Sequence, residues 1–498
     1  MNSAGVSRRT LLTGFLGAGI GLPLLSACAP AATPVGPGAI SAAEAARATT
    51  GRIRSYKLRA GRAQIDLGGR VVDTWTYGDT LPGQVLRATA GDRVRVDFSN
   101  DLPEATSVHW HGLAIRNDMD GVPGLTMPPV PPGAGFAFDF VVPDPGTYWF
   151  HPHTGLQLDH GLYAPFVVDD PREPGAYDAE WVVVLDDWTD GVGPRPEQIL
   201  AELKRQGGSG GMGGMGGMGG MGGMGGSGGM GGADSGDVTY PLFLVNGRAP
   251  TDPDVLAARP GQRVRLRIIN AGADTVFDVA LAGHDLRVTH TDGYPVRPVD
   301  TPAVRIGMGE RYDAVITLGD GVFPLVAAPV GKPGLARALV RTGAGAVPAE
   351  SLRPAGLDQP GLTADRLQAA AGAGLPRRSP DSTQDLVLGG SMRGYEWTIN
   401  GRTYEDTRAL TVRQGESTRL KIRNQTMMTH PVHVHGHTFQ LGDAGGTGPR
   451  KDTVLLPPMG GVDVALVADN PGRWMIHCHN AYHAEAGMMT RLEYVTTP

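Results

Sequence analysis

Gly91-Asp92-Arg93-Val94-Arg95-Val96-Asp97-Phe98-Ser99-Asn100 is the first of three related stretches that decide the fold. The stretch recurs as Gly261 to Asn270 (GQRVRLRIIN) and as Gly415 to Asn424 (GESTRLKIRN). Each copy is a glycine turn followed by a partly alternating strand that ends in Asn. Three well-separated copies predict three related β domains, each expected to be a Greek-key sandwich.

The composition agrees with a large β protein. The chain has 498 residues, with 75 Gly and 40 Pro, which favours many short strands joined by turns over helical bundles. The formal charge of -6 comes from dispersed residues of both signs and offers no basic patch. We therefore expect no nucleic-acid partner.

Two histidine motifs repeat between the first and the third domain. His109-Trp110-His111-Gly112 matches His433-Val434-His435-Gly436, and Pro145 to His153 (PGTYWFHPH) matches Pro471 to His479 (PGRWMIHCH). The second domain has the strand repeat but no His-x-His pair. Four pairs supply eight imidazoles, which can converge if domains one and three pack together. Eight ligands exceed the needs of one ion, so the pattern predicts a multinuclear metal site.

The triplet His477-Cys478-His479 predicts a second, adjoining metal site. In an extended segment successive side chains point to opposite faces, so the two histidines would face one way and Cys478 the other. A thiolate with imidazoles selects copper or zinc, and Cys with two His and a weak axial Met is the blue-copper pattern. Zinc is disfavoured because structural zinc sites prefer closely spaced cysteine pairs. The additional ligands available for copper are His430, His483 and Met488.

With these four motifs, the chain resembles three-domain bacterial multicopper oxidases, close to the actinobacterial copper-resistance enzymes and related to laccases. The resemblance implies an all-β fold of three consecutive cupredoxin-like Greek-key β-sandwich domains and four copper ions per chain. It implies type 1 copper at His430, Cys478, His483 and Met488. Met489 is chemically as good a thioether as Met488, and we expect it to serve core packing. The implied type 2 ligands are His109 and His433, and the type 3 ligands are His111, His151, His153, His435, His477 and His479.

The expected domain organisation follows from the repeats and the changes in composition. Residues 1–28 form a signal peptide, 29–50 a linker and 51–172 the first domain. The second domain is expected at 173–345, with a flexible Gly/Met-rich insert at 207–236. A connector at 346–383 precedes the third domain, 384–498, which carries the type 1 site.

The first residues are expected to direct export. Ser7 to Leu12 (SRRTLL) resembles a twin-arginine signal, and the apolar run that follows is short for a membrane span. Leu25-Ser26-Ala27-Cys28 resembles a bacterial lipobox, which implies cleavage before Cys28 and lipidation of its thiol. The predicted location is the cell envelope, at the outer face of the cytoplasmic membrane, with the lipid as the membrane contact. A soluble exported monomer cleaved near Ala27 or later is the alternative, and a monomer is expected in either case.

The implied activity is an oxidase for Cu(I), Fe(II) and phenols with dioxygen as acceptor, serving copper tolerance. Electrons would enter at type 1 copper and pass through the Cys478 peptide to the cluster. Oxygen reduction consumes protons, so carboxylate relays are expected at Asp120 and Glu485. An Asp-Gly turn explains Asp120 equally well. Some relatives carry Glu at the position of Ala484, a departure that leaves the second relay open.

A glycine-rich tract with regularly spaced methionines lies in the second domain. So much glycine prevents a stable helix, and thioethers are soft ligands suited to Cu(I). The tract is interpreted as a Cu(I)-capture segment, with an inert spacer as the alternative. Its methionines are Met212, Met215, Met218, Met221, Met224 and Met230.

Two other classes of function remain to be separated from the oxidase. A blue-copper electron carrier or a nitrite reductase would lack the full set of eight cluster imidazoles, so His151 and His153 argue against both. A non-enzymatic copper-buffering lipoprotein would rely on the Gly/Met tract instead.

Overall fold

The three copies of the Gly–Asn repeat form equivalent central strands. Each pairs in parallel with the first strand of its domain and antiparallel with a later strand. The predicted repeat is therefore a structural one. The repeat strands are β4 (Arg93–Asn100), β12 (Arg263–Asn270) and β23 (Ser417–Asn424), the first strands are β1 (Ile53–Asp66), β9 (Ala179–Trp188) and β20 (Ser382–Ser391), and the later strands are β6 (Gly135–Val141), β17 (Arg311–Thr317) and β28 (Gly461–Val467).

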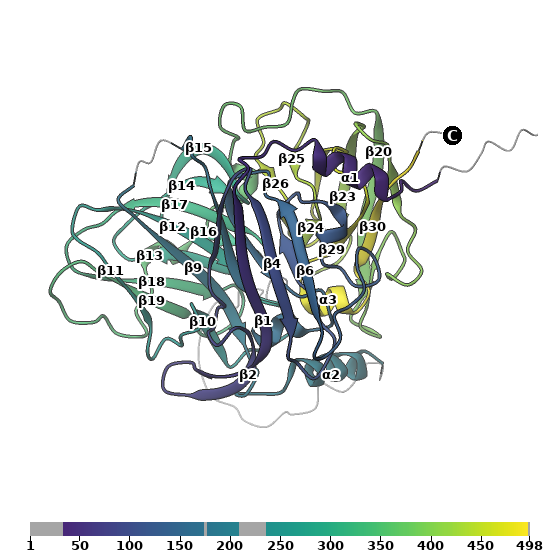
Figure 1. Cartoon of the computed structure of the whole chain (residues 1–498). Coiled ribbons are helices and arrows are strands. Elements are labelled where there is room, and N and C mark those ends of the chain that lie inside the picture. The colour runs from purple at the N-terminus through teal and green to yellow at the C-terminus, as the bar shows by residue number, and fades with distance from the viewer. Residues whose placement is uncertain (1–32, 174–176, 209–235, 497–498) are drawn as a thin grey trace, which may run out of the picture.

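The computed structural model describes residues 33–173, 177–208 and 236–496. In these residues each domain is a sandwich of two sheets, which confirms the predicted all-β fold of cupredoxin-like domains. Figure 1 shows the second domain on the left and the third on the right, with β1, β4 and β6 of the first domain in front. Among the described residues, no helix combines the length and the apolar character needed to cross a membrane.

The remaining strands complete the six sheets of the described residues. In the first domain, β2 (Val71–Tyr77) joins β1, β4 and β6, and the opposite sheet contains β3 (Leu86–Thr89), β5 (His109–His111), β7 (Gly146–His151) and β8 (Ala164–Asp169). In the second, β10 (Leu242–Val245), β14 (Leu286–Thr291) and β15 (Tyr294–Thr301) join β9, β12 and β17, opposite β11 (Asp254–Ala257), β13 (Phe277–Leu281), β16 (Val304–Ile306), β18 (Val322–Pro329) and β19 (Ala336–Arg341). In the third, β21 (Glu396–Ile399), β25 (Phe439–Leu441) and β26 (Arg450–Lys451) join β20, β23 and β28, opposite β22 (Leu410–Val412), β24 (His430–Val434), β27 (Thr453–Leu456), β29 (Arg473–Cys478) and β30 (Met489–Tyr494).

The helices of the described residues are short. They are α1 (Pro37–Ala45), α2 (Pro196–Gly208), α3 (Ala481–Glu485) and the 3-10 turns η1 (Asn117–Met119), η2 (Gln157–His160), η3 (Ala355–Asp358) and η4 (Ala364–Arg366). One hydrophobic core is continuous across the second and third domains, the first domain has its own, and a smaller cluster joins the first domain to the second. The three sandwiches therefore pack against one another through shared hydrophobic clusters.

The Asn at the end of each repeat makes hydrogen bonds to backbone groups of the segments that follow. Asn100, Asn270 and Asn424 are buried, and each side-chain amide donates to two backbone carbonyls at 2.7 to 3.0 Å. Each amide oxygen accepts from the backbone N–H two residues further on. Because a buried backbone group without a partner is costly, one Asn satisfies three such groups in every domain.

The segment before the first domain, which the sequence assigns to a linker at 29–50, contains α1. The backbone N–H of Val35 donates to the carbonyl of Tyr494 at 2.9 Å, so the segment lies along the last strand of the third domain. Glu44 is buried, and its carboxylate accepts from the N–H of Val141 in the first domain at 2.9 Å. This segment therefore bridges domains one and three.

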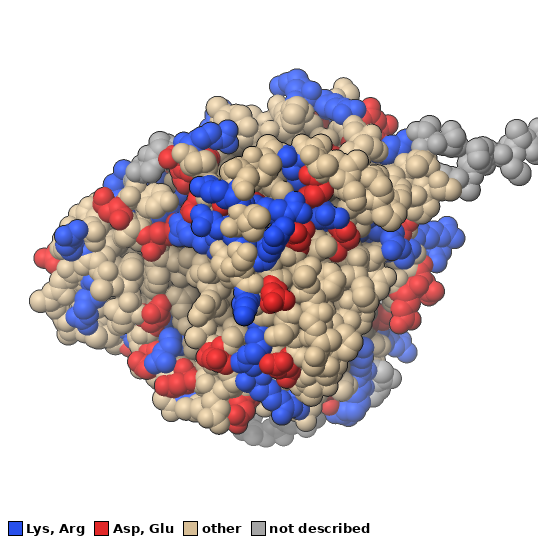
Figure 2. Space-filling view, viewed as in Figure 1, with Lys and Arg blue, Asp and Glu red and all other residues tan. Residues whose placement is uncertain are grey.

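Charges of both signs intermix on the face shown in Figure 2, with basic side chains gathered towards its upper centre. At the start of β1, Arg52 and Arg54 pair with the buried Asp92. Arg93 and Arg95 on β4 pair with Asp139.

Replacing Asn100 by Ala tests the role of the repeat Asn. The change removes three buried hydrogen bonds and should lower the free energy of unfolding by about 1–3 kcal/mol. Urea unfolding of the full chain, followed by tryptophan fluorescence, measures it. Asp101→Ala is the matched control, because that neighbouring carboxylate is half-exposed and makes only a long surface ion pair. Equal midpoints for the two variants would contradict the interpretation.

Candidate metal centres

The His-x-His motifs occupy equivalent strand pairs in the first and third domains. In the first, β5 and β7 run antiparallel and place His109 opposite His151. In the third, β24 and β29 place His433 opposite His477 in the same way. Alternation along β5 sends His109 and His111 to one face, and in the other three pairs the second histidine lies one or two residues beyond the end of its strand. All eight motif imidazoles point to the interface between the two domains.

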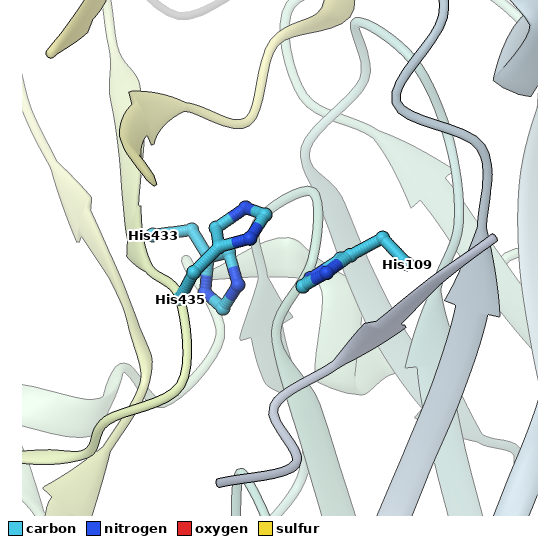
Figure 3. Close-up of side chains that lie close together, drawn as sticks. All are labelled: His109, His433 and His435. Carbon is cyan, nitrogen blue, oxygen red and sulfur yellow. The ribbon is translucent and has the colours of Figure 1, made fainter. Parts of the chain in front are cut away.

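The eight rings form one compact cluster, as the sequence predicts. The His109 and His435 rings stack with centroids 3.8 Å apart, and so do those of His111 and His433. Figure 3 shows His433 and His435 reaching from the third domain towards His109 of the first. The ligand atoms of several triads lie within 4.8 Å of one another, among them His109/His433/His435, His109/His151/His153, His111/His151/His479 and His153/His435/His477.

Most inward nitrogens of this cluster lack hydrogen-bond partners in the described residues. They include Nε2 of His109, His151, His153 and His433 and Nδ1 of His111. Nε2 of His435 and Nε2 of His477 face each other at 3.1 Å. Buried polar atoms are normally satisfied, so a group of orphaned imidazole nitrogens fits bound metal ions.

Electrostatics also favour metal binding by the cluster. Burial, followed by repulsion from neighbouring imidazoles, lowers the pKa of His111, His151 and His153 well below its ordinary value. The same two causes act on the pKa of His435. Since a histidine must be neutral to ligate a metal, these environments hold the rings in the competent form.

The outward nitrogens are held by hydrogen bonds that fix the ring orientations. Nδ1–H of His109 donates to the carbonyl of Asp120 at 2.9 Å, and Nδ1–H of His151 donates to that of Pro152 at 3.0 Å. Nδ1–H of His477 donates to the carbonyl of Cys478 at 2.8 Å. Each bond leaves Nε2 free to face the cluster.

Asp120 lies against the cluster, at the end of η1. Its side chain is 1% exposed, with one carboxylate oxygen 3.2 Å from Nδ1 of His109 and the other 3.0 Å from Nδ1 of His435. The carboxylate therefore bridges a ring of the first domain and a ring of the third. Gly121 follows with a left-handed backbone, which fits the Asp-Gly turn, and the relay role of Asp120 stays a prediction.

Glu485 lies at a cavity of about 140 Å³ that reaches the cluster from another side. The cavity is also lined by His153, His477 and His479. Burial raises the pKa of the Glu485 carboxyl group. Met489 lines the same cavity and packs with Met475 in a small hydrophobic cluster.

The third domain brings together the three groups of the predicted blue-copper site. Sγ of Cys478 lies 3.5 Å from Nδ1 of His430 and 3.7 Å from Nδ1 of His483, and the two nitrogens are 3.0 Å apart. All three residues are fully buried. Asn480 caps α3 by accepting from the N–H of His483, which fixes the last ligand shortly after Cys478. Met488 is buried in the same hydrophobic core as Cys478.

Sequence reasoning missed the carboxylate that holds His483. Oδ2 of Asp237 lies 2.8 Å from Nε2 of His483 and accepts from the hydroxyl of Tyr395 at 2.7 Å. The only signal in the sequence is its position directly after the Gly/Met tract. His437 follows the last histidine pair by two residues, and its Nδ1–H donates to the carbonyl of His435 at 3.0 Å.

Some predicted residues lie outside the described part of the chain. They are the export signal with Cys28, and Met212, Met215, Met218, Met221, Met224 and Met230 of the Gly/Met tract.

Comparison with known proteins places this geometry in one family. Models of the family described as multicopper oxidase match residues 59–173, 179–345 and 377–497. The chain is 52% identical to Multicopper oxidase MmcO of Mycobacterium tuberculosis, over 98% of this chain and 97% of that protein. It is 30% identical to the Copper resistance protein A homolog of Pseudomonas syringae pv. tomato, over 87% and 91%.

Among solved structures, the multi-copper oxidase from Pseudomonas thermotolerans is similar, with a TM-score of 0.68 and 28% identity over 89% of this chain and 99% of that one. The fold, the paired histidine motifs and the matches along almost the whole chain agree. The chain belongs to the multicopper oxidase family and is a three-domain, laccase-like oxidoreductase.

Proposed function

We propose that the protein couples one-electron oxidation of Cu(I), Fe(II) or phenols to the four-electron reduction of dioxygen to water, and that it serves copper tolerance. The supporting observation is the position of Cys478 between two sites. Its sulfur faces His430 and His483, whereas its neighbours His477 and His479 belong to the imidazole cluster. A single stretch of peptide thus joins the site of donor oxidation to the site of oxygen reduction.

The residues present fit four copper ions, because most cluster histidines have an orphaned nitrogen and the sulfur of Cys478 has two imidazoles beside it. Bound copper would supply one-electron uptake from the donor and electron delivery to dioxygen. His430, Cys478, His483 and the buried Met488 would hold type 1 copper. His109 and His433 would hold type 2 copper, and the type 3 pair would be held by His111, His151, His153, His435, His477 and His479.

Proton supply is assigned to two carboxylates. Glu485 lines the cavity that reaches His153 and His479, and burial raises its pKa, so it can hold a proton near the cluster. Asp120 contacts His109 and His435 directly and orients both rings. We propose Glu485 as the entry point for protons and Asp120 as an orienting group that also exchanges them.

Two exposed methionines that adjoin Thr426, a hydrogen-bond partner of His430, support Cu(I) as a donor. The hydroxyl of Thr426 lies 2.7 Å from Nε2 of His430. Met427 follows Thr426 and is 68% exposed, and Met459, 64% exposed, donates its N–H to the carbonyl of Thr426. Soft sulfur ligands favour Cu(I), so this pair offers a capture point close to type 1 copper. The Gly/Met tract stays a second candidate for the same task.

The other functions considered are less well supported. An electron carrier needs the Cys478 site alone and leaves eight converging imidazoles unexplained, and a copper buffer leaves Cys478 itself unexplained. Export, lipidation at Cys28, the cell-envelope location and the monomeric state stay predictions from the sequence.

Cys478→Ser should abolish the blue absorption and donor oxidation, since the thiolate is the type 1 ligand, while most of the cluster copper is retained. Absorption spectra, copper analysis and oxygen uptake with Cu(I), Fe(II) and a phenol measure these effects. Cys28→Ser changes the only other cysteine and should leave all three unchanged. Loss of all copper from Cys478→Ser would show that the two sites are not separable.

Asp237→Asn should slow donor oxidation by about tenfold, because the carboxylate orients His483 from its outer nitrogen. The blue band should shift while the cluster copper stays. Steady-state kinetics and absorption spectra provide the measurement. Tyr395→Phe removes one hydrogen bond to Asp237 and should have a smaller effect of the same kind. Unaltered kinetics and spectrum in Asp237→Asn would reject this role.

Replacing Met427 and Met459 by Ser should raise the KM for Cu(I) about tenfold, equivalent to about 1.4 kcal/mol of lost binding, without affecting phenol oxidation. A variant with the six tract methionines replaced by Ser is assayed in parallel. Val347→Ser, at another exposed apolar side chain, in the connector, is the control. Cuprous kinetics that are unchanged in both methionine variants would argue against Cu(I) capture by thioethers.

A further inference from the structure

The second domain contributes no histidine to the cluster, yet one of its arginines lies directly behind it. Arg311 begins β17, and its guanidinium makes a two-pronged ion pair with Asp452 of the third domain at 2.6 and 2.7 Å. Both side chains are completely buried. A paired guanidinium and carboxylate form one of the strongest and most directional contacts available to side chains.

The same arginine is fixed from the first domain as well. Its Nε–H donates to the carbonyl of Thr147 on β7 at 3.0 Å, and Nη1–H donates to the carbonyl of Gly309 at 3.0 Å. Asp292, in the turn between β14 and β15, accepts from the backbone N–H of Arg311 and from that of Thr453. Arg311 is therefore the point where all three domains meet.

Asp452 in turn holds two rings of the cluster that come from different domains. Nε2–H of His111 donates to its carboxylate at 3.2 Å. Nδ1–H of His433 donates to its backbone carbonyl at 3.0 Å and lies 3.4 Å from its carboxylate. With these bonds made, His111 is left with Nδ1 free and His433 with Nε2 free. The contacts with Asp452 thus determine which nitrogen of His111 and of His433 is left free to bind a metal ion.

The backbone of the second domain touches the rings too. A Cβ added to Gly309 would lie 2.8 Å from Cδ2 of His479 and 3.0 Å from Cε1 of His111. The turn before β17 therefore packs against two cluster histidines at a distance that only glycine permits. Both the turn and Arg311 belong to the second domain.

We propose that Arg311 is a positioning residue for the copper cluster, acting through Asp452 to set the ring orientation and the free nitrogen of His111 and His433. The inference rests on the proposed copper occupancy of those histidines and adds a task for the second domain. The cluster then reaches its full copper affinity only when that domain is docked against the other two.

The test uses the full chain and compares Asp452→Asn with Arg311→Lys. Both should weaken retention of type 2 copper about 10- to 100-fold against a competing chelator, as is typical when the group behind a metal ligand is changed. The electron paramagnetic resonance spectrum of type 2 copper should change as well. The blue band of the Cys478 site should persist and report a folded third domain. Arg311→Lys keeps the buried charge balance, so it is informative even if Asp452→Asn fails to fold.

Asp313→Asn is the matched control. Asp313 is equally buried, is paired with Arg265 at 2.6 Å and accepts from Thr147 of the first domain. None of its hydrogen bonds within the described residues goes to a cluster histidine. Wild-type copper affinity and spectrum in Asp452→Asn and Arg311→Lys would overturn the positioning role of Arg311. An equal loss of copper affinity in Asp313→Asn would do the same, and neither result would affect the proposed function. A wild-type protein that takes up no copper at the cluster would overturn the proposed function as well.

Discussion

The convergence of eight imidazoles, six of which have a buried nitrogen without a hydrogen-bond partner in the described part of the chain, is the constraint on which the rest of the structure depends. Such burial of polar atoms is unfavourable for the polypeptide alone and becomes favourable when cations occupy the space. Half of the rings belong to the first domain and half to the third. The two sandwiches must therefore be held at a fixed separation by contacts that do not involve the metal.

Those contacts are spread around the cluster. Asp120 bridges a ring from each side, α1 joins the two domains at their outer surface, and Arg311 and Asp452 close the side that faces the second domain. The second domain thus helps to hold the first and third domains in place, although it contributes no histidine to the cluster. The second domain also contains Asp237, which contacts His483. A domain that contributes no candidate ligand to either site therefore supports both candidate metal sites.

The sequence was sufficient for the features that repeat. Three copies of one strand predicted three sandwiches, and alternation along His477, Cys478 and His479 predicted sites on opposite faces. It was insufficient where a single side chain acts through the tertiary fold. Arg311 is distant from Asp452 in the sequence, and nothing in the surrounding sequence distinguishes it from other arginines at the start of a strand. Asp237 follows a low-complexity tract, and α1 was hidden in a stretch that resembles a spacer, because its stability comes from packing against two domains rather than from its own periodicity.

The docking of the amino-terminal segment on the final strand has a consequence for the order of folding. Val35 bonds to the carbonyl of Tyr494, and the Thr33 and Thr496 hydroxyls lie 2.8 Å apart, so the first described residues need nearly the last ones to be in place. Contacts between such distant parts of a chain form late. The first sandwich can become compact while synthesis continues, and Glu44 can already contact Val141, but Val35 cannot bond to Tyr494 until β30 exists. The contact of the amino-terminal segment with the third domain is thus among the last to become possible during synthesis, after all eight cluster histidines have been added.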